Sequence, residues 1–118
     1  MEFICYQKCT TCKKAQAWLD KNEIEYTLRD IKENNPSYEE LKGWYKKSGI
    51  LLKKFFNTSG LIYRSMNLKD KLAEMSEEEQ LKLLSTDGML VKRPILLKDG
   101  KVVIGFKEAD WEQFVNRD

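Results

Sequence analysis

The stretch ICYQKCTTCKK, residues 4–14, contains all three cysteines of the chain within eight positions, and the chain has no histidine. The residues EFICY at positions 2–6 form a short apolar run with β-favouring side chains, which predicts a buried strand. After the cysteine loop, Ala15, Trp18, Leu19 and Asn22 recur with the i, i+3, i+4, i+7 spacing of an amphipathic helix. The cysteines therefore lie at a strand-to-helix junction.

A second strand is predicted directly after this helix. In IEYTLRDI, residues 24–31, Ile24, Tyr26 and Leu28 alternate with polar side chains, which is the period of a half-buried strand. Strand, helix and strand in this order favour a parallel βαβ unit.

The middle of the chain has the pattern of helices. Ser37 with Glu40, directly after Pro36, forms a capping box, and the same signal recurs at Ser76 with Glu79. A helix that starts after Ser37 is expected to end near residue 49, which is a glycine.

The last third returns to strands. PILLKDGKVVIGF, residues 94–106, contains two β runs joined at Asp99-Gly100, a strong hairpin signal. The final helix, EADWEQFV, is predicted to turn Trp111, Phe114 and Val115 inward. The expected order is βαβ, a helical insertion and ββα, in a single α/β domain of residues 1–118 with a small mixed sheet.

Composition narrows the function classes. The chain of 118 residues has 21 basic and 19 acidic side chains, a net charge of +2, which is too balanced to indicate direct nucleic-acid binding or a membrane surface. No apolar run reaches the length of a membrane span or a signal sequence. Three clustered cysteines favour a reducing compartment, so we expect a cytoplasmic protein. We also expect that it needs no cofactor.

Cys9 and Cys12 have the C-x-x-C spacing of a redox pair. Cys9 is expected at or just before the helix start, where the unpaired N–H groups, the helix dipole and nearby lysines favour a thiolate. Cys12 follows about one turn later, within reach of Cys9. The pattern predicts that Cys9 attacks, that Cys12 resolves, and that a reversible Cys9–Cys12 disulfide leaves Cys5 in the core of the strand.

Three other interpretations of the cysteines stay open. Zinc usually needs about four ligands from two separated pairs, and this chain has one pair and no histidine. The spacing C-x3-C-x2-C of Cys5, Cys9 and Cys12 resembles the iron–sulfur motif of radical S-adenosylmethionine enzymes, which are built on a much larger barrel. Finally, the cysteines could be structural thiols, because a buried free cysteine behaves as a small hydrophobe.

A second candidate stretch is KRPIL, residues 92–96. Pro94 cannot donate to a sheet, so it should begin the strand or lie at an edge. Arg93 precedes it and is a candidate to bind an anionic group in a substrate groove beside the dithiol. An ordinary surface arginine before a strand is the alternative.

Four blocks of the sequence, KCTTCKKAQAWL, KKFFNTSG, LKDKL and DGMLVKRPILL, resemble the ArsC/Spx family in their order along the chain. This family comprises glutaredoxin-coupled arsenate reductases and the redox-sensing transcription regulators Spx and MgsR. The resemblance implies a thioredoxin-like fold, a redox-active Cys9 and a cis-proline at Pro94. It also implies a thioredoxin- or glutaredoxin-like reductant or a small thiol as partner.

The resemblance leaves two functions open. Arsenate-reducing members use several arginines to hold the oxyanion. Of these, only Arg93 matches here, because Asn57 and Gly105 stand near the other two positions. Arg64 is a candidate replacement, and Thr10 and Thr11 at the helix start are further candidate anion-binding residues.

A second cysteine such as Cys12 is typical of the regulators, which bind the C-terminal domain of the RNA polymerase alpha subunit. The regulators usually carry a tail beyond the last helix, whereas this chain stops at Asp118. The resemblance thus implies the alpha subunit as the partner for the alternative function, and the missing tail argues against that alternative.

Overall fold

The computed structural model describes residues 1–116, and its contacts divide the chain into two compact units. The first unit combines Met1–Asp30 with the segment from Arg93 onward, and the second is Ile31–Lys92. Within residues 1–116, none of the helices has the length and apolar character needed to cross a membrane.

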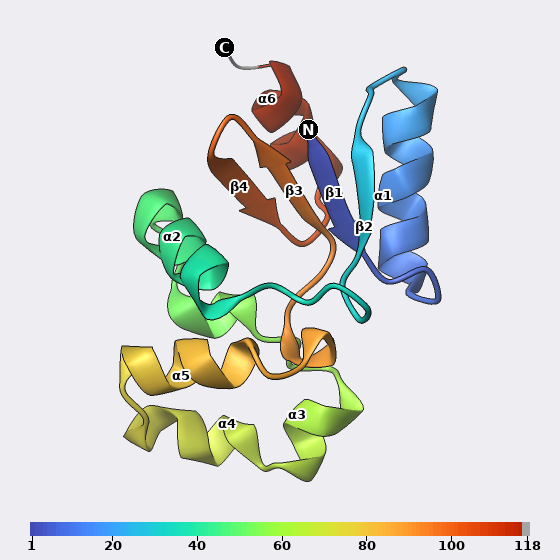
Figure 1. Cartoon of the computed structure of the whole chain (residues 1–118). Helices are drawn as coiled ribbons and strands as arrows, with labels where there is room; N and C mark the ends of the chain where they lie inside the picture. The colour runs from blue at the N-terminus through green and yellow to red at the C-terminus, as the bar shows by residue number, and fades with distance from the viewer. Residues whose placement is uncertain (117–118) are drawn as a thin grey trace. The chain divides into compact units, whose positions relative to one another are not determined.

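The first unit contains a four-stranded sheet and two helices (Figure 1). The strand order is β2-β1-β3-β4, with β1 and β2 parallel and the pairs β1–β3 and β3–β4 antiparallel. This confirms the predicted small mixed sheet and the order βαβ, helical insertion, ββα. The elements of this unit are β1 (Glu2–Cys5), α1 (Thr10–Lys21), β2 (Thr27–Asp30), β3 (Ile95–Lys98), β4 (Lys101–Ile104) and α6 (Glu108–Asn116).

One face of this sheet is covered by α1 and α6. Phe3 of β1 lies opposite Leu96 of β3, and both belong to a buried cluster with Leu19 of α1 and Trp111 of α6. Trp111 also donates its indole N–H to the carbonyl oxygen of Gly105 at 2.7 Å. The apolar periodicity of both helices is therefore explained by packing on one side of the sheet.

The β3–β4 hairpin forms as predicted. Asp99 and Gly100 have φ values of 49° and 79°. Positive φ at both central residues is the requirement of the two-residue hairpin turn that the Asp-Gly signal predicts.

The second strand is shorter than predicted. Pairing with β1 begins at Thr27, and Ile24 and Tyr26 lie before the strand, although both still pack on the buried cluster. Leu28 pairs with the buried Phe3 of β1 and so lies on the same face of the sheet, but 43% of this residue is exposed. The predicted alternation therefore holds, and Leu28 stays partly exposed because β2 is an edge strand.

The second unit is helical, and both predicted capping boxes are present. Ser37 accepts from the backbone N–H of Glu40 at 3.1 Å, and Ser76 accepts from that of Glu79 at 3.1 Å. Gly49 ends α2 with a φ of 73°, as expected for a left-handed C-cap. The unit contains α2 (Tyr38–Ser48), η1 (Leu52–Phe55), α3 (Leu61–Ser65), α4 (Leu68–Lys71), η2 (Leu72–Glu74), α5 (Glu77–Leu84) and η3 (Gly88–Leu90).

Candidate active site

The loop between β1 and α1 places Cys9 at the N-cap of α1. Its backbone is extended, with φ of −86° and ψ of 124°, and its carbonyl oxygen accepts from the N–H of Lys13 at 3.0 Å. Cys9 is half-buried, whereas Thr10 and Thr11 in the first turn are exposed. The first N–H groups of a helix have no partner within the helix, so this turn offers donors and a positive dipole end beside the Cys9 sulfur.

Cys12 lies in the same turn, on the buried side of α1. Only 1% of Cys12 is exposed, and its Sγ accepts from the backbone N–H of Tyr6 at 3.3 Å. Cys5 lies in the same buried cluster as Cys12, and Cys9 packs against this cluster. All three cysteines are free thiols in this structure, so the Cys9–Cys12 pair is close but not bonded.

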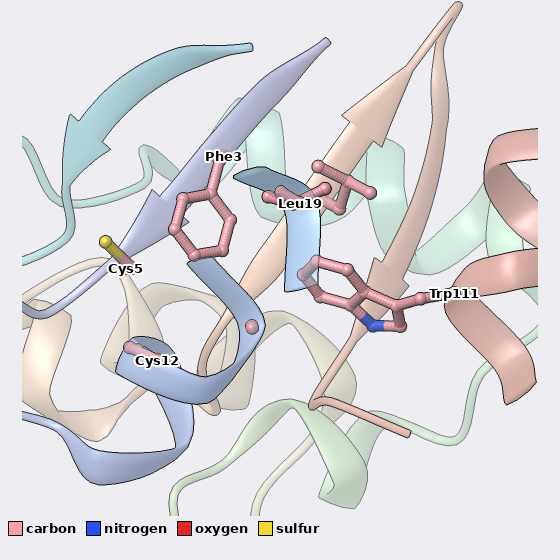
Figure 2. Packing of buried hydrophobic residues seen from close by; sticks show 7 residues of the cluster. Phe3, Cys5, Cys12, Leu19 and Trp111 are labelled. Carbon is pink, nitrogen blue, oxygen red and sulfur yellow. The ribbon is translucent and has the colours of Figure 1, made fainter. Parts of the chain in front are cut away.

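Cys5 is the third member of this group. Because side chains alternate along a strand, Cys5 points to the same face of the sheet as Phe3, which is the face that α1 covers. Figure 2 shows Cys5 at the end of β1 and Cys12 on the helical turn beside it. The prediction that Cys5 is buried in the strand is confirmed, with 2% exposed, but its neighbour in the core is the Cys12 thiol.

The hydrogen bond between Cys5 and Cys12 moves their acidities in opposite directions. Donation by the Cys12 thiol lowers the pKa of Cys5 despite the burial of this residue. The same hydrogen bond, together with burial, raises the pKa of Cys12 far above the usual thiol range. The shared hydrogen bond therefore makes Cys5 the more acidic and Cys12 the less acidic thiol of this pair.

Arg93 and Pro94 enter the site through the pairing of β1 with β3. The last ladder pair is Ile4 with Ile95, and continuing this antiparallel register sets Cys5 opposite Pro94 and Tyr6 opposite Arg93. The Arg93–Pro94 peptide bond is cis, as the family resemblance implies.

The guanidinium group of Arg93 lies over the ring of Tyr6, with Cζ 5.3 Å from the ring centroid. Within residues 1–116, its Nε and Nη1 atoms are buried and have no hydrogen-bond partner. The carbonyl oxygen of Tyr6 accepts from the N–H of Cys9 at 2.9 Å, so Tyr6 connects Arg93 to the cysteine loop. Two buried donors without a partner are suited to an anionic ligand.

The other candidate anion-binding positions are divided between the two units. Gly105 donates its N–H to the carbonyl oxygen of Pro94 at 2.8 Å and offers no side chain. Asn57 and Arg64 belong to the second unit, where the amide of Asn57 donates to the carbonyl oxygen of Met89 at 3.5 Å and Arg64 is exposed on α3. The first unit therefore brings together Cys9, Cys12, Thr10, Thr11, Arg93 and Pro94.

The part of the chain that the structure describes holds no group of three or more Cys, Asp or Glu side chains arranged to bind a metal ion. The three cysteines instead gather in one place, where Cys5 and Cys12 belong to a buried cluster and Cys9 packs against it. Such a group is suited to disulfide exchange, which needs only pairwise contact between sulfur atoms.

Sequence reasoning missed two features of this site. One is Tyr6, whose ring and backbone join Arg93 to the cysteine loop, and the other is the contact between Cys5 and Cys12. The contact between Cys5 and Cys12 had a signal in the sequence, since a βαβ unit sets the end of its first strand beside the start of its helix. The position of the Tyr6 ring against Arg93 depends on the β1–β3 register, which the sequence does not reveal.

Comparisons with known proteins agree with this architecture. The chain is 54% identical over 113 residues to the uncharacterized protein YusI of Bacillus subtilis strain 168, covering 96% of each chain. It is 31% identical over 110 residues to the regulatory protein MgsR of the same strain, covering 93% of this chain and 86% of MgsR.

A solved structure from Streptococcus mutans UA159, described as a possible arsenate reductase, has 47% sequence identity and a TM-score of 0.87, covering 94% of this chain and 96% of that one. The model of the ArsC family matches residues 5–114, from the buried Cys5 to the last helix. A match of this extent, on a fold that carries the cysteine loop and the Arg-Pro segment, shows that the chain belongs to the ArsC family.

Proposed function

We propose that the protein is a cytoplasmic thiol–disulfide oxidoreductase in which Cys9 is the nucleophile and Cys12 the resolving thiol. The observation that carries the proposal is the position of Cys9, half-buried at the N-cap of α1 with the thiol of Cys12 in contact behind it. A helix N-terminus stabilises both an attacking thiolate and a leaving thiolate.

The proposed reaction has two steps. The Cys9 thiolate attacks one sulfur of an oxidised substrate, so that a mixed disulfide forms and the other sulfur leaves as a thiolate. Cys12 then gives its proton to the thiolate released in the first step and attacks the Cys9 sulfur. The bond between Cys9 and the substrate breaks, its electron pair leaves on the second half of the substrate as a thiolate, and a Cys9–Cys12 disulfide remains. A thioredoxin- or glutaredoxin-like protein, or a small thiol, returns both cysteines to thiols.

Arg93 is proposed to bind the anionic group of the substrate. Its buried Nε and Nη1 atoms have no partner among the described residues, and its guanidinium group lies over the ring of Tyr6. The cis-bonded Pro94 lies next to Arg93, directly before β3.

The test of the resolving role is the Cys12→Ser variant, incubated with an oxidised anionic disulfide such as glutathione disulfide. Cys12→Ser should accumulate a mixed disulfide on Cys9, because the thiol that releases it has been removed. Cys9→Ser is the matched control and should form none. Trapping on another cysteine, or equal trapping in both variants, would refute the assignment.

Arsenate itself is proposed to be a poor substrate. A doubly charged oxyanion is well held by several charge-assisted hydrogen bonds, each worth about 1.5–3 kcal/mol. The absence of arginine at Asn57 and Gly105 removes two such donors, a loss of roughly 3–6 kcal/mol, or about 10² to 10⁴ in catalytic efficiency. Steady-state arsenate reduction with thioredoxin and with glutaredoxin checks this, and a kcat/KM of about 10⁴ M⁻¹s⁻¹ or above would contradict it.

The similarity to MgsR favours a second candidate function, a redox-sensing regulator. In that case the Cys9–Cys12 disulfide controls contact with the RNA polymerase alpha subunit. A pull-down from lysate under oxidising and reducing conditions separates the two functions. Redox-dependent recovery of the alpha subunit supports the regulator, and recovery of mixed-disulfide clients by Cys12→Ser supports the oxidoreductase.

A further inference from the structure

The proposed reaction uses Cys9 and Cys12 and leaves Cys5 without a role, although Cys5 is in direct contact with one of them. Cys5 and Cys12 belong to one buried cluster, together with Phe3, Leu19 and Trp111 (Figure 2). Cys9 packs against the same cluster from the N-cap of α1, and Cys12 follows it in the first turn of that helix. Cys12 is therefore close to both other cysteines.

We propose that Cys5 is a second resolving thiol, which takes over the disulfide from Cys9 by exchange at the sulfur of Cys12. The inference rests on the proposed function, because the Cys9–Cys12 disulfide of that reaction is its starting point. No further oxidant or reductant is needed.

The exchange is a single displacement. The Cys5 thiolate attacks the Cys12 sulfur of the Cys9–Cys12 disulfide, the Cys5–Cys12 bond forms, and the Cys12–Cys9 bond breaks. The electron pair of the broken bond leaves on Cys9, so one thiolate and one disulfide exist before and after the step.

The attacking sulfur, on Cys5, and the leaving sulfur, on Cys9, are both well placed for this displacement. The attacking group, Cys5, belongs to the same buried cluster as Cys12, the sulfur that it attacks. The leaving group, Cys9, lies at the N-cap of α1, where the helix dipole favours a thiolate.

The exchange changes which sulfur is accessible. Before it, the disulfide includes the half-buried Cys9; after it, the disulfide joins two residues that are only 2% and 1% exposed. Cys9 is then a free thiol on an oxidised chain. Small thiols can reduce the buried disulfide only by way of Cys9, because that sulfur alone of the three is accessible.

Trypsin distinguishes the two disulfides. Cleavage after Lys8 and Lys13 places Cys5 on the peptide of residues 1–8, and both Cys9 and Cys12 on the peptide of residues 9–13. A Cys9–Cys12 disulfide therefore stays within one peptide, whereas a Cys5–Cys12 disulfide joins two.

The experiment oxidises the full chain with one equivalent of 5,5′-dithiobis(2-nitrobenzoate), quenches samples over time with N-ethylmaleimide, and maps the peptides without reduction. The expected sequence is a disulfide within residues 9–13 first, followed by peptides joined through Cys12 that carry the alkyl group on Cys9. A disulfide confined to residues 9–13 at all times, with Cys5 always alkylated, would overturn the exchange and leave the proposed function intact.

A bridge between Cys5 and Cys9 would also overturn the exchange, because Cys12 would then not be the shared sulfur. Absence of any disulfide would overturn both the exchange and the proposed function. As a control, Cys5→Ala should lose the joined peptides and keep the disulfide within residues 9–13.

A second variant keeps the proposal testable if Cys5→Ala does not fold. Cys9→Ser treated with diamide should form the Cys5–Cys12 disulfide directly, and this disulfide should resist small thiols more than the one in the wild-type chain. Failure of Cys9→Ser to form it would overturn the proposal, since the contact between the two sulfurs is its basis.

Discussion

At the scale of single residues, the site depends on Tyr6 as much as on the cysteines. Its N–H donates to the sulfur of Cys12, its carbonyl oxygen accepts from Cys9, and its ring lies against Arg93. These backbone contacts remain when Tyr6 is replaced by a residue that keeps its N–H. Such a substitution therefore tests the side chain of Tyr6, its ring and its hydroxyl group, against Arg93.

Replacing Tyr6 with Leu should weaken binding of an anionic disulfide substrate. Stacking of a cation on an aromatic ring is worth about 0.5–2 kcal/mol, which corresponds to a rise in KM of roughly 2- to 30-fold. Tyr6→Phe keeps the ring and is the matched control, with KM expected close to that of the wild type. Equal effects of the two variants would show that the hydroxyl group, and not the ring, is what matters.

The coupled thiols also predict how stability depends on pH. The pKa of Cys5 is lowered in the folded chain, so its contribution is present above the ordinary thiol pKa of about 8.5 and is lost as pH falls. The pKa of Cys12 is raised, so its contribution is present below about pH 8.5 and is lost as pH rises. The free energy of unfolding of the reduced chain should therefore rise toward that pH and fall beyond it.

Urea unfolding of the reduced protein between about pH 7 and 9.5 checks this profile, with slopes of at most about 1.4 kcal/mol per pH unit for each thiol. Cys12→Ala removes the hydrogen bond that causes both shifts, so its profile should be flatter on both sides. An unchanged profile in Cys12→Ala would mean that other groups determine the pH dependence.

At the scale of elements, the two helical capping boxes and the hairpin turn were predictable because each depends on residues close in sequence. Ser37 with Glu40, Ser76 with Glu79 and the Asp99-Gly100 turn all formed as expected. The helices α3 and α4 were not predicted, since they span only five and four residues and their apolar periodicity cannot be recognised. The exposure of Leu28 was missed because it depends on the place of β2 at the sheet edge.

In the candidate site, too, the features that depend on neighbouring residues could be predicted, and those that join distant residues could not. The N-cap position of Cys9 follows from a local strand-to-helix transition, so sequence could predict it. The stacking of Tyr6 on Arg93 joins residues that are 87 positions apart (93 minus 6), and it depends on the register of β1 with β3. Register between distant strands is set by the packing of the whole sheet, which no local pattern encodes.

Two glycines of the helical unit give a matched pair of predictions. A Cβ at Gly88, where η3 begins, would lie 1.8 Å from the backbone oxygen of Ile31, so Gly88→Ala should destabilise the fold by about 1–3 kcal/mol or more. A Cβ at Gly43, inside α2, meets nothing within 4 Å, so Gly43→Ala should stabilise it by roughly 0.5–1 kcal/mol. Urea denaturation measures both, and similar effects of the two substitutions would contradict this account of the η3 turn.

At the scale of the whole molecule, the expectation of a single domain of residues 1–118 is tested by unfolding cooperativity. Chains of this length usually unfold in one transition. In Trp44→Phe, tryptophan fluorescence reports only on Trp18 and Trp111 of the first unit, whereas circular dichroism reports on all helices. The two probes should give the same urea midpoint, and separate midpoints would mean that the two compact units unfold independently.

The proposed reaction requires that Cys9 attacks first and that Cys12 resolves. The most direct measurement is a single turnover of the wild-type chain with limiting glutathione disulfide, stopped at successive times by acid and analysed by peptide mass spectrometry. Glutathione should appear first on Cys9 and should then be lost as the Cys9–Cys12 disulfide forms. Glutathione that appears first on Cys12 or Cys5, or a Cys9 adduct that persists while Cys12 remains a free thiol, would contradict it.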